Sequence, residues 1–250
     1  MRSDEFISIL SQPSDGEDKF EERRKGVPLG IDMTGAVVLS QKRTRALTAR
    51  HTCVTGGNRR QFIKRLVLTL SALYEKDGAC FIVLSPCDDY GELLRLKNID
   101  LTAPYLRTRE DFDLMKSTVV ELLRMREAGE GYPTLFLVAD GLEELDGFNA
   151  QNDFAEYREL FELAAHKEGV EVITGVDVMK SIFSGQPSAF VEMGNCLVTT
   201  REGGKADVTY VLDDGSLAAP IMMYYPDAPS ITETVILFNC IARDEEDGRA

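Results

Sequence analysis

The sequence lacks the features that mark membrane-spanning, secreted and zinc-binding proteins. No apolar run approaches the roughly 20 residues needed to cross a bilayer, and the start, MRSDEFISIL, carries two acids before a very short apolar stretch, unlike a signal peptide. The five cysteines include no Cys-x-x-Cys pair, and His51 and His166 are the only histidines. This composition argues against a Cys/His zinc site and indicates reduced thiols in a cytosolic protein.

Acidic residues are absent from one stretch of an otherwise acidic chain. The 250 residues have a formal net charge of −14, yet no acid occurs from residue 33 to residue 74. Residues 1–65 hold 13 Lys and Arg against 8 Asp and Glu, whereas residues 66–250 hold 15 against 34. The acidic body argues against general nucleic-acid binding, which depends on neutralising phosphates. The basic segment from Lys42 to Arg65 is either a solvated rim or a contact with an adjacent domain, a subunit or an anionic ligand.

Strand-like and helix-like segments alternate along most of the chain. Hydrophobic residues make up 44%, which is enough for a packed core. Residues 1–25 are rich in Pro, Gly, Ser and charge and predict a flexible lead-in, and residues 26–250 predict a single domain. The alternation predicts an α/β fold with a mostly parallel central sheet and helices on both faces. Such sheets bind ligands at the carboxyl ends of their strands.

The expected elements begin with a hairpin over residues 26–40 that turns near Gly35. The predicted strands are Ala36–Leu39, Thr52–Thr55, Phe81–Leu84, Thr134–Ala139, Val170–Thr174, Asn195–Thr199, Val208–Leu212 and Ile221–Tyr225. The predicted helices are Asn58–Glu75, Thr108–Arg126, Asn152–Lys167, Asp177–Phe183 and Ile231–Ala242. The acidic face of the helix over 152–167 is either solvated or a surface for a basic neighbouring domain.

The first strand-to-helix junction, HTCVTGGNRRQFIKRL, stands where P-loop proteins carry Gly-x-x-x-x-Gly-Lys-Ser/Thr. In that motif, backbone amides and the helix N-terminus cradle the phosphates, the Lys reaches the β and γ oxygens, and the hydroxyl binds magnesium. The glycine pair fits the first half of the motif, and it fits a tight strand-to-helix turn equally well. The residues of this loop are Gly56, Gly57, Asn58, Arg59, Arg60, Gln61 and Phe62.

Several segments resemble motifs of the FtsK/SpoIIIE family of RecA-like motor ATPases, and they occur in the same order as in that family. In the family, a run of Pro-His-apolar-apolar-apolar-x-Gly precedes the phosphate loop. This chain has a similar run after VPLGID and the basic segment, with His51, Cys53, Val54 and Gly56 in the matching positions. The segment YPTLFLVADGLEEL resembles the Walker B strand, and AAHKEGVEVITGVDVMKSIFSG resembles the strand followed by Thr-Gln-Arg-Pro. The resemblance covers residues 26–242 and implies a RecA-like three-layer sandwich.

The resemblance also implies that most of the family's nucleotide-site residues are replaced. The Walker A Lys position falls at Gln61, or at Phe62 if the loop is not shortened, and the magnesium-binding hydroxyl position falls at Phe62 or Ile63. The Walker B Asp is retained as Asp140. At a strand end, this residue either caps the next loop or takes a metal role.

Two glycines stand where the family carries its catalytic Glu and its γ-phosphate-sensing Gln, namely Gly141 and Gly175. Hydrolysis needs a Lys, a metal and a base together, so these losses imply a pseudo-ATPase. Arg59 or Arg60 could replace the Lys as a phosphate contact, but neither supplies the missing base. We therefore expect neither a bound metal nor ATP with magnesium as a cofactor.

Within the family, the chain looks like the last, degenerate ATPase-like domain of the type VII secretion coupling proteins EssC and EccC. That likeness implies recognition of small helical secreted substrates and docking to neighbouring ATPase domains of the same chain, with RecA-like domains often forming homo-oligomeric rings. It implies a cytoplasmic domain tethered to the membrane through upstream segments outside this chain. Two alternatives stay open, a weakly active or NTP-binding ATPase with a non-standard phosphate loop and a DNA translocase module. The acidic body speaks against the second.

Overall fold

The computed structural model describes residues 28–40, 51–73, 78–96, 100–102, 105–127, 132–147, 150–177, 195–212, 214 and 216–225. The predicted lead-in over 1–25, the predicted helix over 231–242 and almost all of that over 177–183 lie outside these residues. The division of the chain near residue 26 therefore stays a prediction. None of the helices described is long and apolar enough to cross a membrane.

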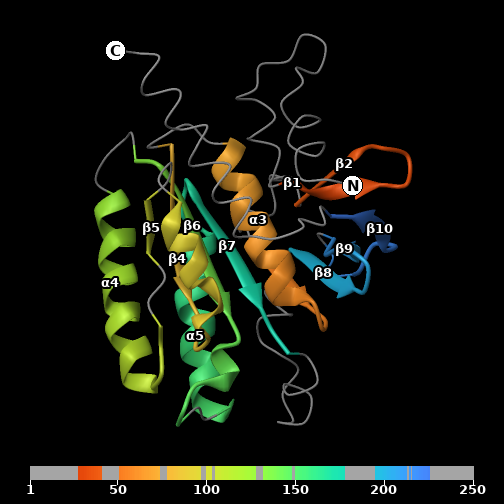
Figure 1. The fold of residues 1–250 in the computed structure, drawn as a ribbon. Helices are drawn as coiled ribbons and strands as arrows, with labels where there is room; N and C mark the ends of the chain where they lie inside the picture. The colour runs from red at the N-terminus through yellow and green to blue at the C-terminus, as the bar shows by residue number, and fades with distance from the viewer. Residues whose placement is uncertain are drawn as a thin grey trace, which may run out of the picture.

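Ten strands form one sheet in the described part of the chain, in the order β2-β1-β10-β9-β8-β3-β7-β6-β4-β5 (Figure 1). Six neighbouring strands run parallel: β8 (Cys196–Arg201), β3 (His51–Thr55), β7 (Val170–Gly175), β6 (Thr134–Asp140), β4 (Ala79–Leu84) and β5 (Asp100–Thr102). Antiparallel pairing adds four more: β9 (Lys205–Tyr210), β10 (Ile221–Tyr224), β1 (Pro28–Asp32) and β2 (Val37–Leu39). The predicted mostly parallel sheet is confirmed.

Helices pack on both faces of this sheet. Helix α3 (Arg59–Leu73) contributes its apolar stripe to a core cluster that includes Phe136 and Val138 of β6. Helices α4 (Arg109–Glu127) and α5 (Ala150–Ala165) belong to a second cluster with the alternate β6 residues Leu135 and Leu137. Because alternate side chains of a strand point to opposite faces, the two clusters lie on opposite sides of the sheet. The predicted three-layer arrangement is confirmed.

The structure adds short elements that the sequence pattern did not predict. These are the 3-10 helices η1 (Asp88–Arg95) and η2 (Leu142–Glu144) and the three-residue strand β5. The strand predicted over 208–212 is instead β9, three residues earlier at its start. The predicted hairpin is confirmed as β1 and β2, and its Gly35 has a φ of 87°.

The carboxyl ends of the parallel strands meet at one edge of the sheet. Strand β6 ends at Asp140, which pairs in register with Gly175 at the end of β7. Gly175 is also in register with Val54, near the end of β3. The loops that follow these strands therefore converge on Asp140, where ligands of parallel sheets usually bind.

His51 is a buried polar side chain that links two central strands. Its Nε2 lies 2.8 Å from the Thr174 hydroxyl of β7, and the residue is 2% exposed. Nδ1 is buried without a hydrogen-bond partner among the described residues. Burial lowers the pKa of His51 from 6.5 to about 3, because the charged imidazolium loses its hydration.

The His51→Gln variant should lose part of the acid sensitivity of the fold. Since the folded pKa is depressed, unfolding takes up a proton at His51 as the pH falls below 6.5, and the free energy of unfolding decreases towards pH 3. Between pH 6.5 and 5 the wild type should lose about 2 kcal/mol more than His51→Gln. Urea unfolding over this range measures the difference, and the two proteins should run parallel from pH 7 to 8. Parallel curves below pH 6 would contradict the buried neutral histidine.

Candidate functional site

The glycine pair forms the turn between β3 and α3. Gly56 has a φ of 97°, and a side chain there would overlap the backbone of Thr200. The Arg59 N–H donates to the Gly56 carbonyl at 3.2 Å and closes the turn. A Cβ at Gly57 would meet no atom within 4 Å. The conformation and close packing at Gly56 require glycine, which supports the predicted tight turn.

The positions expected for the lysine and the hydroxyl lie on α3, beyond this turn. Gln61 is exposed, whereas Phe62 and Ile63 are buried in the core. The Phe62 ring packs edge-on against Tyr225 with centroids 5.0 Å apart. The first turn of the helix therefore contributes apolar packing where a P-loop protein has its phosphate and magnesium ligands.

Asp140 is fully buried, and side chains of the same chain contact both its oxygens. Arg59 Nε donates to Oδ1 at 2.9 Å, and Arg60 Nε donates to Oδ2 at 3.3 Å. The Tyr90 hydroxyl of η1 donates to Oδ2 at 3.0 Å. The strand-end carboxylate is thus enclosed by two guanidinium groups and a phenol.

Glu144 binds the outer side of the same two arginines. Its Oε1 lies 3.0 Å from Arg59 Nη2, and its Oε2 lies 2.6 Å from Arg60 Nη2. Arg60 Nη1 also lies 3.5 Å from a carboxylate oxygen of Asp89. Each arginine therefore bridges Asp140 and Glu144 through different nitrogens of its guanidinium group. We call Arg59, Arg60, Tyr90, Asp140 and Glu144 the arginine–carboxylate cluster.

The pKa shifts in the cluster have opposing causes. Burial raises the pKa of Asp140, and the nearby Arg59 and Arg60 charges oppose this rise. Burial also disfavours the Arg59 charge, but Asp140 and Glu143 outweigh this effect and raise its pKa. Burial and the Asp140 charge raise the pKa of Tyr90 well above 10, which keeps its hydroxyl protonated as a donor.

The two glycines predicted to replace the catalytic Glu and the sensor Gln border this cluster. Gly141 has a φ of 71°, and a Cβ there would lie 3.2 Å from Arg59 Nη2. A Cβ at Gly175 would overlap the Asp140 carboxylate and crowd Ile63. The Gly141 N–H donates to the Gly175 carbonyl at 3.0 Å. The described cluster thus fills the space that a side chain at Gly175 would need and narrows the space at Gly141.

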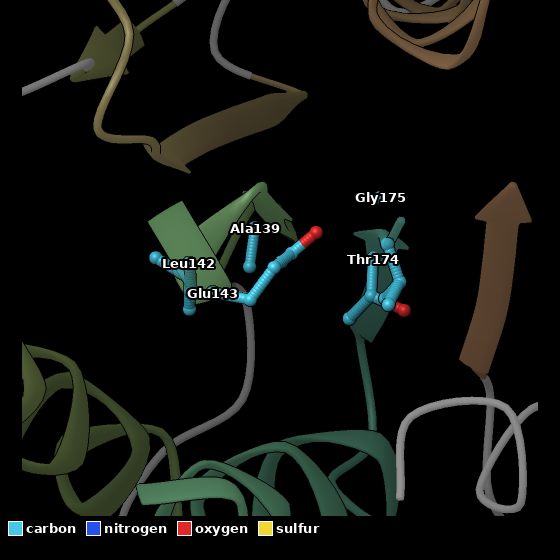
Figure 2. A pocket seen from close by; sticks show the side chains of 6 residues that line it. Ala139, Leu142, Glu143, Thr174 and Gly175 are labelled. Atoms are coloured by element: carbon cyan, nitrogen blue, oxygen red, sulfur yellow. The ribbon is translucent and has the colours of Figure 1, made fainter. Parts of the chain in front are cut away.

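Glu143 lies beside the cluster and lines a small pocket with Ala139, Leu142, Thr174, Gly175 and Val176. It points from η2 towards β7 (Figure 2). Its Oε1 accepts the Asp177 N–H at 2.7 Å and lies 3.8 Å from Arg59 Nη2, and its Oε2 is buried without a hydrogen-bond partner in the described structure. The pocket has no room for a water molecule. Within the described ranges, no three His, Cys, Asp or Glu side chains are grouped as metal ligands.

The sequence predicted that the carboxyl ends of the parallel strands lie together, but it did not predict the partners of Asp140. The structure brings Arg59 and Arg60 to Asp140. By contrast, Gln61 is exposed and Phe62 is buried in the core. The structure also brings in Tyr90, whose acidic segment CDDYGELLR begins three residues after the end of β4. Because this segment follows a strand adjacent to β6, its position in the sequence could have indicated that Tyr90 lies near Asp140.

In the described part of the basic segment, three cations pair within this chain, and the two interpretations of the whole segment stay predictions. Lys64 Nζ lies 3.0 Å from Glu92 Oε1 of η1 and is itself 5% exposed. Arg59 and Arg60 are engaged by the acids of the cluster. These three side chains are therefore already engaged by acids of the same chain. Residues 42–50 lie outside the described structure.

No model of a known protein family matches the chain, and no curated protein sequence is significantly similar to it. Among solved structures, the cytoplasmic domain of the type VII secretion ATPase EccC of Thermomonospora curvata has a TM-score of 0.60 at 15% identity, over 93% of this chain and 32% of that one. ATPases 2 and 3 of EssC from Geobacillus thermodenitrificans give 0.57 at 11% identity, over 87% of this chain and 49% of that one.

A third structure contains a bound peptide. ATPases 2 and 3 of T. curvata EccC in complex with a signal sequence peptide give a TM-score of 0.55 at 15% identity, over 87% of this chain and 43% of that one. This chain thus spans a third to a half of the length of these relatives. The resemblance predicted from the sequence is confirmed at the level of the fold, which is that of the RecA-like ATPase domains of EccC and EssC.

Proposed function

We propose that this chain is a non-hydrolysing ATPase-like domain of a type VII secretion coupling ATPase. In this role it recognises the helical signals of small secreted substrates and docks against neighbouring ATPase domains in the cytoplasm. The observation that carries the proposal is the occupancy of Asp140. Both of its oxygens are bound by Arg59, Arg60 and Tyr90, at the strand end where the ATPases of this fold bind magnesium.

Phosphoryl transfer sets requirements that the described side chains do not meet. It needs a phosphate-binding lysine, a metal on the strand-end aspartate and a residue that orients the attacking water. Here Gln61 is exposed, Phe62 is core, and Gly141 has no side chain. Loss of a single charge-stabilising donor costs on the order of 3–4 kcal/mol in the transition state, so combined losses support a role without hydrolysis.

The fold relatives support the secretion role. One fold relative is a cytoplasmic domain of EccC that matches 93% of this chain, and one EccC structure carries a signal sequence peptide. Two of these structures contain ATPases 2 and 3, and this chain covers 49% and 43% of them. A domain that binds peptide and neighbours needs no nucleotide chemistry of its own. The net charge of −14 favours this role over DNA translocation, which requires contacts to phosphates.

The proposal predicts that the 250-residue chain neither binds nor hydrolyses MgATP at cellular concentrations. Isothermal titration should give no binding heat, because the Arg59 and Arg60 side chains are already paired with carboxylates. Phosphate release should be at background for both the wild type and the Asp140→Asn variant. Micromolar binding with turnover that Asp140→Asn abolishes would instead establish an active ATPase with a non-standard phosphate loop.

The recognition role predicts binding of synthetic peptides that carry the C-terminal helical signal of small type VII substrates. We expect dissociation constants of about 1–100 μM, typical of a transient peptide contact, in fluorescence anisotropy. Adding MgATP should leave them unchanged. A peptide of the same composition in scrambled order, which lacks the amphipathic face, should bind at least about tenfold more weakly. If neither the peptide nor purified neighbouring EssC-type ATPase domains bind, the proposed role is wrong.

A further inference from the structure

The arginine–carboxylate cluster has the features of a filled cation site. Arg59 and Arg60 place two positive charges between Asp140 and Glu144, with four nitrogen–oxygen contacts of 2.6 to 3.3 Å. We propose that this guanidinium pair is a built-in replacement for a divalent cation. On this view it fixes the loops at the carboxyl edge of the sheet in one conformation without nucleotide.

The burial of Asp140 explains why a replacement is required. A carboxylate with no exposure loses its hydration and needs compensating charge and hydrogen bonds. In ATPases of this fold, magnesium supplies much of that charge. Here the guanidinium groups and the Tyr90 hydroxyl provide it, and each of these groups lies within hydrogen-bond distance of an Asp140 oxygen.

The surrounding positions fit the guanidinium pair rather than a nucleotide. A side chain at Gly175 would overlap the Asp140 carboxylate in its present position, and one at Gly141 would press on Arg59. The loss of the sensor and catalytic side chains therefore makes room for the cluster. These coordinated changes argue against a site that has merely decayed.

The cluster also joins the segments that a bound nucleotide would otherwise organise. Its members come from the start of α3, from η1 after β4, from the end of β6 and from η2. Arg60, whose side chain is 30% exposed, forms the solvent side of the cluster and also reaches Asp89. Removal of both arginine side chains would therefore open Asp140 and Glu144 to solvent ions.

This inference rests on the proposed non-hydrolytic role, and its test uses the whole 250-residue chain with Mn²⁺ as the probe. In the Arg59→Ala/Arg60→Ala variant, Asp140 is left as an unpaired buried charge, so the melting midpoint should fall by about 6–20 °C. Mn²⁺ at tenfold above its dissociation constant should then raise the midpoint by about 3–6 °C. Electron paramagnetic resonance titration should give Mn²⁺ binding at least about tenfold tighter than in the wild type.

Two further variants isolate the cause. Adding Asp140→Asn to the double variant removes the unpaired charge, so it should restore most of the lost midpoint and abolish the response to Mn²⁺. The variant Arg124→Ala/Arg158→Ala, which removes two arginines from helical surface pairs with Glu121 and Glu162, should change neither property.

The possible outcomes separate this inference from the proposed function. A folded double variant without a Mn²⁺ response, or a triple variant no more stable than the double, would overturn the inference and leave the secretion role standing. If the double variant does not fold but the triple variant does, the arginine pair compensates Asp140 as proposed. MgATP turnover by the wild type would overturn the non-hydrolytic role itself.

Discussion

The negative charge of Asp140, buried at the end of a central strand, constrains the loops around it. An isolated carboxylate in that position would be strongly destabilising, because its hydration is lost and nothing replaces it. Arg59 and Arg60 arrive from the helix after β3, and Tyr90 arrives from the segment after β4. These loops must keep their present positions for the charge to stay compensated, so a single ionised group links the geometry of three separate segments.

The order of the strands explains why these segments converge on Asp140. Strand β6 lies between β7 and β4, so the end of β6 is flanked by Gly175 on one side and by the start of η1 on the other. Strand β3 is one position further away, and long side chains from the first turn of α3 span that distance. Arginine suits the task because its planar group donates in several directions and can bridge two carboxylates at once.

Much of the fold could be predicted from the sequence, whereas the contacts within the arginine–carboxylate cluster depend on residues far apart in the chain. Buried apolar runs and helical stripes predicted the parallel sheet with helices on both faces, and the Gly56 turn and Asp140 strand end were found where expected. Short elements such as η1 and β5 carry too few residues for a periodic signal. Local patterns also carry no information on which acid meets which base. The pairing of Arg60 with Glu144, 84 residues apart, was therefore invisible, as was the crowding that excludes a side chain at Gly175.

The ion pairs around Asp140 and Lys64 bear on the uneven distribution of charge along the chain. The acid-free stretch from 33 to 74 suggested either a solvated rim or a contact with a partner, and its Arg59, Arg60 and Lys64 meet acids of their own chain. A phosphate loop that had simply lost its lysine and metal would leave Asp140 unpaired, at a cost of about 3–5 kcal/mol, a large share of the stability of most domains. Such a loss is tolerable only if compensating charge is acquired with it. The presence of two arginines on Asp140 therefore supports the proposed non-nucleotide role more strongly than the absence of the lysine alone.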